Sequence, residues 1–464
     1  MSPESMLAKS RQQATQAARD AASRSPAYRV LLAEAGIDVA QLARLRDPAQ
    51  LPLLTKANTF ARFSLEQLAG SLQPRELADV LTSSGNGGDT FGFSLATRRS
   101  HDRSWYGIDL GLQDAFDVDG RSTLLVNCLP MGVVFKSRAV TVANVSVRED
   151  MACAILREVG PSFEQCIVCT DPLFVNRLLD HAQTAGVDWT ALSASLILGE
   201  EVLVEAQREY IAARTGIDLD RDPRRLVGSS FGVGELGLNL LFETRESIRL
   251  QRALALAPLG AAWLCRPVSQ CAMPVLFCFN PMRCHVEIVE PDAHGFGALC
   301  ITMLDNQAVI ALPRYLTGDV ARLISPAEAA QACTAAGLQA PWLPMLALRG
   351  RSRDHSRSPL AVEDIKQAIY CDHELARALT GAFSLGQRAD GVLHLQLQAR
   401  PGLDPVPHDL TAGLARRLAP AGQRLEIAIL PAGEFAHHSV QDYERKFRYL
   451  DETLSAHPAS YSAG

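Results

Sequence analysis

Two kinds of hydrophobic pattern alternate along the chain. Short runs of consecutive apolar residues, such as those at 166–169 and 195–198, are separated by longer segments with helical spacing, such as 171–185 and 205–214. A continuous apolar run of four to eight residues is typical of a strand buried on both faces of a parallel sheet. The alternation therefore predicts an α/β fold with layered β-sheets and flanking helices.

The two ends of the chain have patterns of their own. Residues 6–35 read as a helical leader that stops at Gly36, and 57–72 as a further helix. The charge-dense stretch 348–357 indicates a boundary. We therefore predict a large N-terminal domain of residues 1–350 and a small C-terminal α/β domain of residues 351–464, the latter with a helix at 362–378 and a strand at 392–398.

Composition narrows the class of protein. With 464 residues, of which 47% are hydrophobic and 21% charged, the chain can bury at least one large core. The net charge of −6 provides no overall basic field for nucleic acid or anionic lipid. No apolar run approaches the roughly 20 residues that cross a bilayer, and the polar N-terminus lacks a secretory segment. We expect a cytoplasmic protein that binds neither nucleic acid nor membrane, as a monomer or homodimer.

A glycine-rich stretch at 82–90 lies between two apolar runs and predicts a loop joining two strands. Successive backbone N–H groups in such a loop can point at one anion, so the triphosphate of a nucleotide is a plausible guest. It is not a Walker loop, because no Lys-Ser or Lys-Thr closes it. An ordinary Gly-, Ser- and Asn-rich turn remains the alternative.

Three further polar turns follow strand-like runs. Gly199-Glu200-Glu201 and the turn that ends at Glu235 each follow a short apolar run, and Thr317-Gly318-Asp319 places an acid between two expected strands. Ligands of open α/β sheets bind where strands end and loops begin, so the first two turns suit one shared site. Two unrelated turns are the alternative for the first pair.

Eleven cysteines are spread along the chain, and we expect reduced thiols. The densest group could hold a structural zinc ion. Several of its members lie in apolar runs, where cysteine behaves as a small core residue, so both possibilities stay open. The group comprises Cys265, Cys271, Cys278, Cys284, His285 and Cys300.

The order and spacing of these pieces resemble the adenylate-forming superfamily, and within it the phenylacetate-CoA ligase-like branch. The stretches 25–37 and 51–56 are similar to that branch's N-terminal region, and 82–88 falls at its phosphate loop. Phe231–Glu235 resembles its aromatic-Gly-x-Thr-Glu motif. Tyr315–Asp319 matches its Tyr-x-Thr-Gly-Asp motif, and Gly350-Arg351 the start of its hinge.

The resemblance implies a role for each turn. The loop would hold the phosphates of ATP, Glu235 would bind Mg²⁺, and Phe231 would lie against the adenine. Asp319 and Arg351 would hold the ribose. The implied nucleotide-binding residues are Ser83, Ser84, Gly85, Asn86, Gly87, Gly88, Gly199, Glu200, Ser230, Phe231, Gly232, Asp319 and Arg351.

The resemblance also implies a moving C-terminal domain that carries a catalytic lysine. Arg353 or Asp354 would be the pivot. Lys446, in a stretch similar to the family's terminal Gly-Lys-x-x-Arg-Val-x-Asp pattern, would stabilise charge on the phosphate during adenylation. A solvated lysine on an amphipathic helix is the alternative for Lys446.

Departures from the family pattern indicate a divergent member. Asn86 and Gly87 stand where the loop usually has two threonines, and Asp89 adds a negative charge. Gly234 replaces the threonine ahead of Glu235. The glycine-containing stretch that usually follows the hinge is missing.

The sequence therefore predicts an AMP-forming ligase that activates a small carboxylic acid with ATP and Mg²⁺. The acyl group would pass to a thiol such as CoA or the phosphopantetheine of a carrier protein. Alternatives are a nitrogen nucleophile, a non-carboxylate substrate, and a nucleotide-binding homologue without turnover. An aromatic acid would suit a stacking wall made from Trp105, Tyr106, Phe135 and Phe242, for which a place in the core is the equal alternative.

Overall fold

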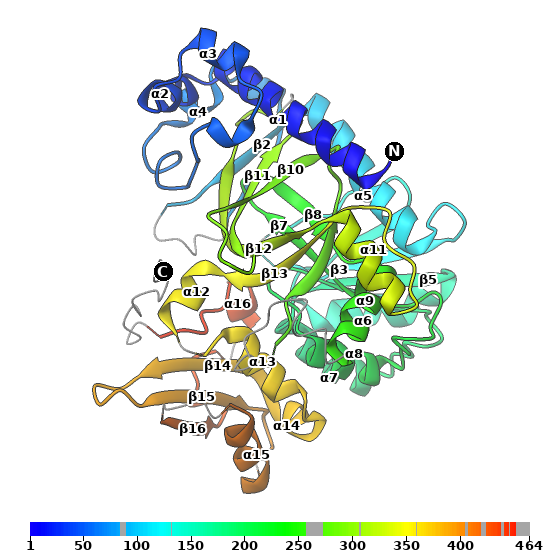
Figure 1. Ribbon diagram of the computed structural model, residues 1–464. Helices are drawn as coiled ribbons and strands as arrows, with labels where there is room; N and C mark the ends of the chain where they lie inside the picture. The colour runs from blue at the N-terminus through cyan, green and yellow to red at the C-terminus, as the bar shows by residue number, and fades with distance from the viewer. Residues whose placement is uncertain are drawn as a thin grey trace. The chain divides into compact units, whose positions relative to one another are not determined.

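The computed structural model describes residues 1–83, 90–130, 132–256, 272–305, 308–358, 360–403, 407–418, 424–437, 440–444 and 446–451. The chain folds into two compact units (Figure 1). The first comprises Met1–Ala115, Ser230–Leu250 and Leu276–Leu348, and the second Phe116–Ser229, Gln251–Val275 and Arg349–Gly464. Residues after 349 thus group with Phe116–Ser229. The division into functional domains at residue 350 stays a prediction.

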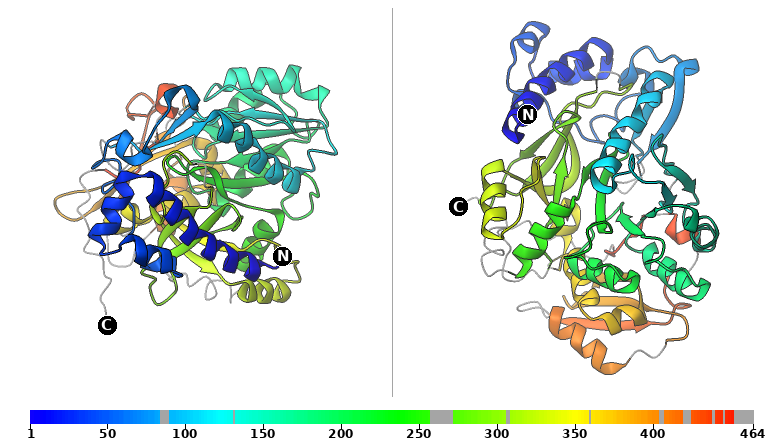
Figure 2. Two further views of the ribbon diagram at one scale, coloured as in Figure 1. Left: turned by 90° about the horizontal axis from the view of Figure 1, so that it is seen from above. Right: turned by 90° about the vertical axis from the view of Figure 1, so that its right-hand side faces the viewer.

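The N-terminal leader forms two helices, α1 (Pro3–Arg24) and α2 (Pro26–Glu34). They separate at Ser25, whose side chain accepts a hydrogen bond from the Tyr28 N–H and so starts α2, with Pro26 at its first position. Gly36 then adopts a positive φ of 71°. Helix α1 lies along β10 (Cys284–Val289) and β11 (Gly297–Met303), and Figure 2 shows the same helix from two further sides.

The first unit contains a mostly antiparallel sheet and a separate hairpin. The hairpin pairs β1 (Leu77–Thr82) with β2 (Phe93–Thr97), one on each side of the glycine loop, as predicted. The sheet has the order β10-β11-β12-β13-β9-β8-β7. The remaining strands and helices that belong to this unit in whole or in part are α3 (Val39–Arg44), α4 (Leu65–Ala69), α5 (Arg98–Phe116), β8 (Gly237–Phe242), α9 (Arg245–Leu256), β9 (Val275–Phe279), β12 (Tyr315–Ile324), α11 (Pro326–Ala335) and β13 (Met345–Arg351), with short 3-10 turns at Pro48–Gln50 and Pro74–Glu76.

The second unit begins with the parallel sheet that the apolar runs predicted. Its order is β7-β6-β5-β3-β4, and every residue of β3 and β5 is buried. Its elements are β3 (Thr123–Asn127), β4 (Thr141–Asn144), α6 (Glu149–Glu158), a 3-10 turn at Gly160–Ser162, β5 (Gln165–Thr170), α7 (Phe174–Ala185), β6 (Ser195–Leu198), α8 (Glu205–Thr215) and β7 (Val227–Val233).

The C-terminal segment adds a three-stranded sheet of order β14-β15-β16 to the second unit. Helix α13 contacts α8, and Tyr370 lies 5.5 Å from Tyr210 between ring centres, so this segment and the parallel sheet share one hydrophobic core. Its elements are α12 (Ser352–Arg357), α13 (Val362–Tyr370), α14 (His373–Ala378), β14 (Leu379–Gln387), β15 (Leu393–Ala399), α15 (His408–Leu418), β16 (Leu425–Leu430) and α16 (Val440–Tyr443).

Three predicted elements differ from those observed. The helix expected at 57–72 is reduced to α4, because Ser64 and Gln67 form a capping box that starts the helix only at Leu65. The helix expected at 362–378 is broken by Asp372, which caps α14. Thr317-Gly318-Asp319 lies within the single strand β12, where Gly318 has a positive φ of 85°.

The described members of the cysteine group are core residues. Cys278, Cys284 and Cys300 are buried, and burial raises the pKa of all three thiols, those of Cys278 and Cys300 to about 12. Cys265 and Cys271 lie outside the described residues. Within the described ranges no group of three or more potential ligands is placed to hold a metal ion. No helix in the same ranges has the length and the apolar stretch that crossing a bilayer requires.

Candidate functional site

A tight turn in the first unit fixes the backbone at Lys56. The Thr55 N–H donates to the Asn58 side chain, at 2.8 Å, and the Asn58 N–H donates to the Thr55 hydroxyl, at 3.2 Å. Just before the turn, Leu54 pairs with Tyr315, through N–H bonds from Leu54 to the Arg314 carbonyl and from Leu316 to the Leu54 carbonyl, each 2.9 Å. The start of β12 therefore sets where Lys56 lies.

The Lys56 ammonium joins two residues that the sequence assigned to one site. It lies 3.0 Å from the Ser83 hydroxyl and 2.9 Å from Glu235 Oε1. The Ser83 hydroxyl in turn accepts the Gly92 N–H at 3.0 Å. Both stems of the glycine loop, Ser83 and Gly92, thus meet one lysine and one carboxylate.

Tyr315 belongs to the same cluster, because its phenol lies close enough to Glu235 for the carboxylate charge to act on it. Burial raises the pKa of the Tyr315 phenol, and the negative charge of Glu235 raises it further. The phenol therefore stays protonated at neutral pH. The Glu235 side chain is only 4% exposed, so Lys56 compensates a charge that water scarcely reaches.

Two glycines allow this close packing. A Cβ on Gly92 would lie 2.3 Å from Glu235 Cγ, and a Cβ on Gly234 would lie 2.8 Å from Ser83 Cα. The second contact is with backbone, which cannot rotate away. Gly234 is therefore the residue that lets the end of β1 rest on the turn before Glu235, which accounts for the missing threonine at this position.

The other predicted residues of the first unit lie on β7 and β12. The Ser230 hydroxyl bonds Asn239 at 2.9 Å, and the half-buried Phe231 ring lies 6.5 Å from Phe277. Gly232 is exposed, whereas Asp319 is buried and its N–H donates to the Thr317 hydroxyl. Ser84, Gly85, Asn86, Gly87, Gly88 and Asp89 lie outside the described residues, so their assignment to the phosphates stays a prediction.

Gly199, Glu200, Arg351 and Lys446 belong to the second unit. Glu200 has a positive φ of 71°, which is unfavourable for a residue other than glycine and marks the turn after β6 as strained. Lys446 Nζ lies 3.8 Å from Glu200 Oε2, so the structure brings these two predicted residues together. Asp319 and Arg351 belong to different units, and their joint role at one ribose stays a prediction.

A small pocket surrounds the Lys446 ion pair and contains a carboxyl group that the sequence did not suggest. Asp171 lines it and is 7% exposed; one of its oxygens accepts the Leu173 and Phe174 N–H groups, each at 2.9 Å. Burial raises the pKa of Asp171 to about 7, an effect that Glu201 and Glu200 increase. The pocket is lined by Pro130, Asp171, Leu173, Glu200, Glu201, Tyr443, Lys446 and Phe447.

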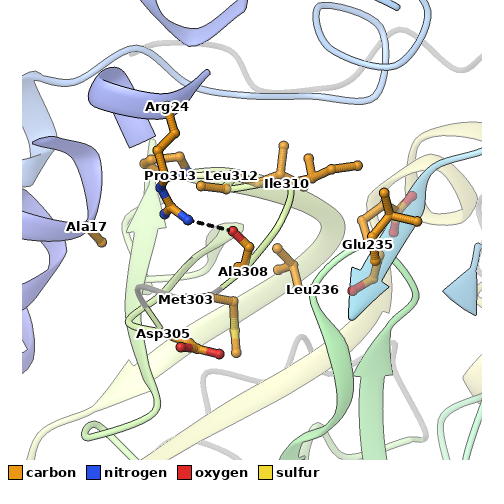
Figure 3. Close-up of a pocket in the computed structure, with 13 residues that line it drawn as sticks. Ala17, Arg24, Glu235, Leu236, Met303, Asp305, Ala308, Ile310, Leu312 and Pro313 are labelled. Carbon is orange, nitrogen blue, oxygen red and sulfur yellow. Dashed lines mark hydrogen bonds between the residues drawn. The ribbon is translucent and has the colours of Figure 1, made fainter. Parts of the chain in front are cut away.

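A second pocket lies beside Glu235 in the first unit. It is small and partly open to solvent. Figure 3 shows Arg24 on the side away from Glu235, where it donates to the Ala308 carbonyl at 3.0 Å. Most of the lining is aliphatic, including Leu95, Leu236, Met303, Ile310, Leu312 and Pro313. The proposed aromatic wall contributes no residue to the lining as described.

Comparison with solved structures identifies the fold. A structure of 2-hydroxyisobutyryl-CoA ligase in the postadenylation state, in complex with R3-HIB-AMP, superposes with a TM-score of 0.67 at 13% identity, over 97% of this chain and 89% of that one. The fold is that of the adenylate-forming acyl-CoA ligases. An open conformation of the same ligase, in complex with 2-HIB-AMP and CoA, gives 0.54.

Fatty acyl-adenylate ligases from E. coli and L. pneumophila have a TM-score of 0.50 at 15% identity, with 82% of this chain and 67% of that one covered. No protein-family model and no curated protein matches the sequence. Membership of the adenylate-forming superfamily, and of its phenylacetate-CoA ligase-like branch, therefore stays a prediction.

Sequence reasoning missed Lys56, Tyr315 as a neighbour of Glu235, and Asp171, and it gave Glu201 no role of its own. Lys56 and Tyr315 belong to stretches that the resemblance singled out, but their meeting depends on the pairing of Leu54 with β12. Glu201 directly follows Glu200, and its acidic side chain in a turn after a buried strand was the available signal.

Proposed function

We propose that the protein activates a carboxylic acid as an acyl-adenylate and transfers the acyl group to a thiol such as CoA. A carboxylate oxygen would attack the α-phosphorus of ATP and displace pyrophosphate. The thiol sulfur would then attack the acyl carbon, and AMP would leave as the thiol proton passes to solvent. The observation that carries this proposal is the Lys56–Ser83–Glu235 cluster at the stems of the glycine loop, in a fold shared with adenylate-forming ligases.

Lys56 has the chemistry to contact a phosphate. The Thr55–Asn58 turn fixes its backbone, and its ammonium, which carries three donors, hydrogen-bonds Ser83 and forms an ion pair with Glu235. A fixed cation aimed at phosphate oxygens stabilises the charge that develops on them during transfer. We assign Lys56 this role and Lys446 the corresponding role on the C-terminal segment.

Mg²⁺ belongs to the proposal through Glu235. A single carboxylate suits this ion, which is usually bound through one or two carboxylates together with substrate phosphates. When bound, the ion would offset negative charge on the phosphates. The Lys56 ion pair already neutralises the same carboxylate at 2.9 Å, so the metal and Lys56 compete for Glu235.

The acid remains to be identified, and the pocket beside Glu235 supports a small aliphatic one. Its aliphatic lining favours burial of an alkyl group and offers no ring for stacking among the described residues. We propose that alkyl acids support turnover better than aryl acids. The product of the second step distinguishes CoA from two other possible acceptors, a carrier-protein thiol and a nitrogen nucleophile.

The test is ATP–pyrophosphate exchange against a panel of alkyl and aryl acids, with and without CoA. Exchange that depends on one acid establishes adenylation, and formation of its CoA thioester establishes the transfer. Lys56→Ala should lower the exchange kcat by at least about 100-fold, the loss typical of removing one preorganised transition-state contact. The control is Lys9→Ala, an exposed lysine on α1 that should leave exchange unchanged.

Silence across the panel, or full exchange in Lys56→Ala, would contradict the proposal. In the first case nucleotide binding without turnover is the function that remains. Calorimetric titration with ATP in the presence and absence of Mg²⁺ would then detect it.

A further inference from the structure

The segment that carries Lys446 is held on both sides by aromatic residues. Tyr443 packs edge-on against Phe174 of α7, at 5.5 Å between ring centres, and Phe447 packs edge-on against Tyr449 at 4.8 Å. Tyr449 also lies 4.5 Å from Phe383 of β14. These rings belong to the second unit, so Lys446 lies on a short bridge between two packed anchors.

Backbone hydrogen bonds fix the far end of this bridge. The Leu385 N–H donates to the Tyr449 carbonyl at 2.8 Å, and the Asp451 N–H donates to the Leu385 carbonyl at 2.9 Å. Leu450 thus pairs with β14 as a short parallel extension of the sheet. Any movement of Tyr449 would break these bonds.

Glu201 connects this terminal anchor to the turn after β6. Its Oε2 accepts the Tyr449 hydroxyl at 2.8 Å and faces Lys366 Nζ of α13 at 2.5 Å. Lys366 Nζ also lies over the Tyr449 ring, 4.5 Å from its centre. One carboxylate therefore binds two side chains that already touch each other.

The electrostatics favour the charged form of this group. Burial alone raises the pKa of Glu201, but Lys366, the Tyr449 hydroxyl and Lys446 outweigh it and hold the pKa below its ordinary value. The Glu201 side chain is 12% exposed and that of Lys366 is 6% exposed. Hydrogen bonds to a charged group that is shielded from water are among the stronger ones in proteins.

We propose that Glu201 is a positioning residue: by binding Tyr449 and Lys366 it holds the terminal segment so that the Lys446 ammonium faces Glu200. Glu201 and Glu200 are adjacent in one turn, so the same backbone that anchors the segment also supplies the partner of Lys446. The role in catalysis rests on the proposed function, in which Lys446 serves adenylation. The positioning of Lys446 by Glu201 does not depend on the proposed function.

The first measurement is the chemical reactivity of Lys446. Wild type, Glu201→Gln and Tyr449→Phe are treated with an acetylating N-hydroxysuccinimide ester, and the modification rate of each lysine is followed by mass spectrometry. Loss of a hydrogen bond to a charged, shielded carboxylate should raise the Lys446 rate by about tenfold or more. Exposed Lys9 serves as the internal reference, and Glu158→Gln, at an exposed ion pair, as the matched control variant.

Tyr449→Phe keeps the ring contacts with Phe383 and Phe447 and removes only the hydroxyl. It therefore keeps the proposal open to refutation even if Glu201→Gln fails to fold. Unchanged Lys446 reactivity in the folded variants would overturn the positioning role.

The second measurement separates this proposal from the proposed function. In ATP–pyrophosphate exchange, the variants should lose kcat while KM for ATP stays within about twofold, because a misplaced lysine weakens the transition state more than ground-state binding. A rise in Lys446 reactivity with unchanged kcat would support positioning by Glu201 and remove Lys446 from the reaction. A rise in KM alone would overturn the expected catalytic consequence of the contact.

Discussion

Asp171, a buried carboxyl group in the Lys446 pocket, makes the stability of the folded protein depend on pH. Its pKa of about 7, against an ordinary value of 3.8, means that the folded protein retains a proton that the unfolded chain has lost between these pH values. The stability that this proton contributes is complete below about pH 4 and is lost as pH rises through about 7. At about 1.4 kcal/mol per pH unit, the upper limit of this loss is roughly 4 kcal/mol.

We therefore expect Asp171→Asn to flatten the dependence of stability on pH. The amide keeps an oxygen for the Leu173 and Phe174 N–H groups but does not titrate. The melting temperature of the variant relative to wild type should rise from pH 4 to pH 7 and then level off. Thermal unfolding at several pH values measures this, and a constant difference between the two proteins would contradict the assignment.

At the scale of residues, the sequence could predict a cluster whose members belong to motifs that the resemblance assigns to one site. Ser83 and Glu235 were assigned to one site, and the structure brings both to Lys56. Lys56 itself acquired no role, because its position depends on Leu54 pairing with a strand about 260 residues away in sequence. Spacing along a chain carries no information about such a contact until the register of the sheet is known.

Among elements, the hairpin β1–β2 and the turn at Gly234 depend on each other. A Cβ at residue 234 would lie 2.8 Å from Ser83 Cα and 2.9 Å from Ser83 N. Gly234→Ala should therefore push the hairpin away and cost about 1–3 kcal/mol in the free energy of unfolding, as overpacked sites do.

Denaturant unfolding measures this cost, and exchange activity should fall with it because Ser83 moves from Lys56. The matched control is Gly107→Ala in α5, where an added Cβ meets nothing within 4 Å. Equal stability of the two variants would show that the hairpin yields without strain.

Elements were predicted well where burial alone decides and poorly where polar side chains bind the local backbone. The runs that became β5 and β6 are mostly apolar, so their burial in the sheet decided their structure. Residues 57–63 have helical composition, but Asn58 and Thr55 bind each other's backbone and hold a turn instead. The expected turn at Thr317–Asp319 continues as a strand because β11 pairs with β12 on both sides of Gly318.

At the scale of the whole molecule, the shared core of the second unit bears on the predicted movement of residues 351–464. Asn176 of α7 donates to the Tyr370 hydroxyl at 2.6 Å and to the Thr380 carbonyl at 3.0 Å. Gln367 of α13 accepts the Ala206 N–H at 3.1 Å. A rotation of the C-terminal segment would break these bonds and expose apolar side chains on both partners.

This arrangement predicts that the C-terminal sheet and the helices of the parallel sheet unfold together. Phe383→Ala removes a ring with no exposed surface and should cost about 3–5 kcal/mol. If the core is cooperative, amide hydrogen exchange should speed up in α7 as well as in β14, because both lose the same supporting contacts. Leu403→Ala, at a half-exposed position, is the control and should change neither. Faster exchange confined to β14–β16 would instead show that the C-terminal segment opens alone, as a domain that turns about Arg353 or Asp354 would require.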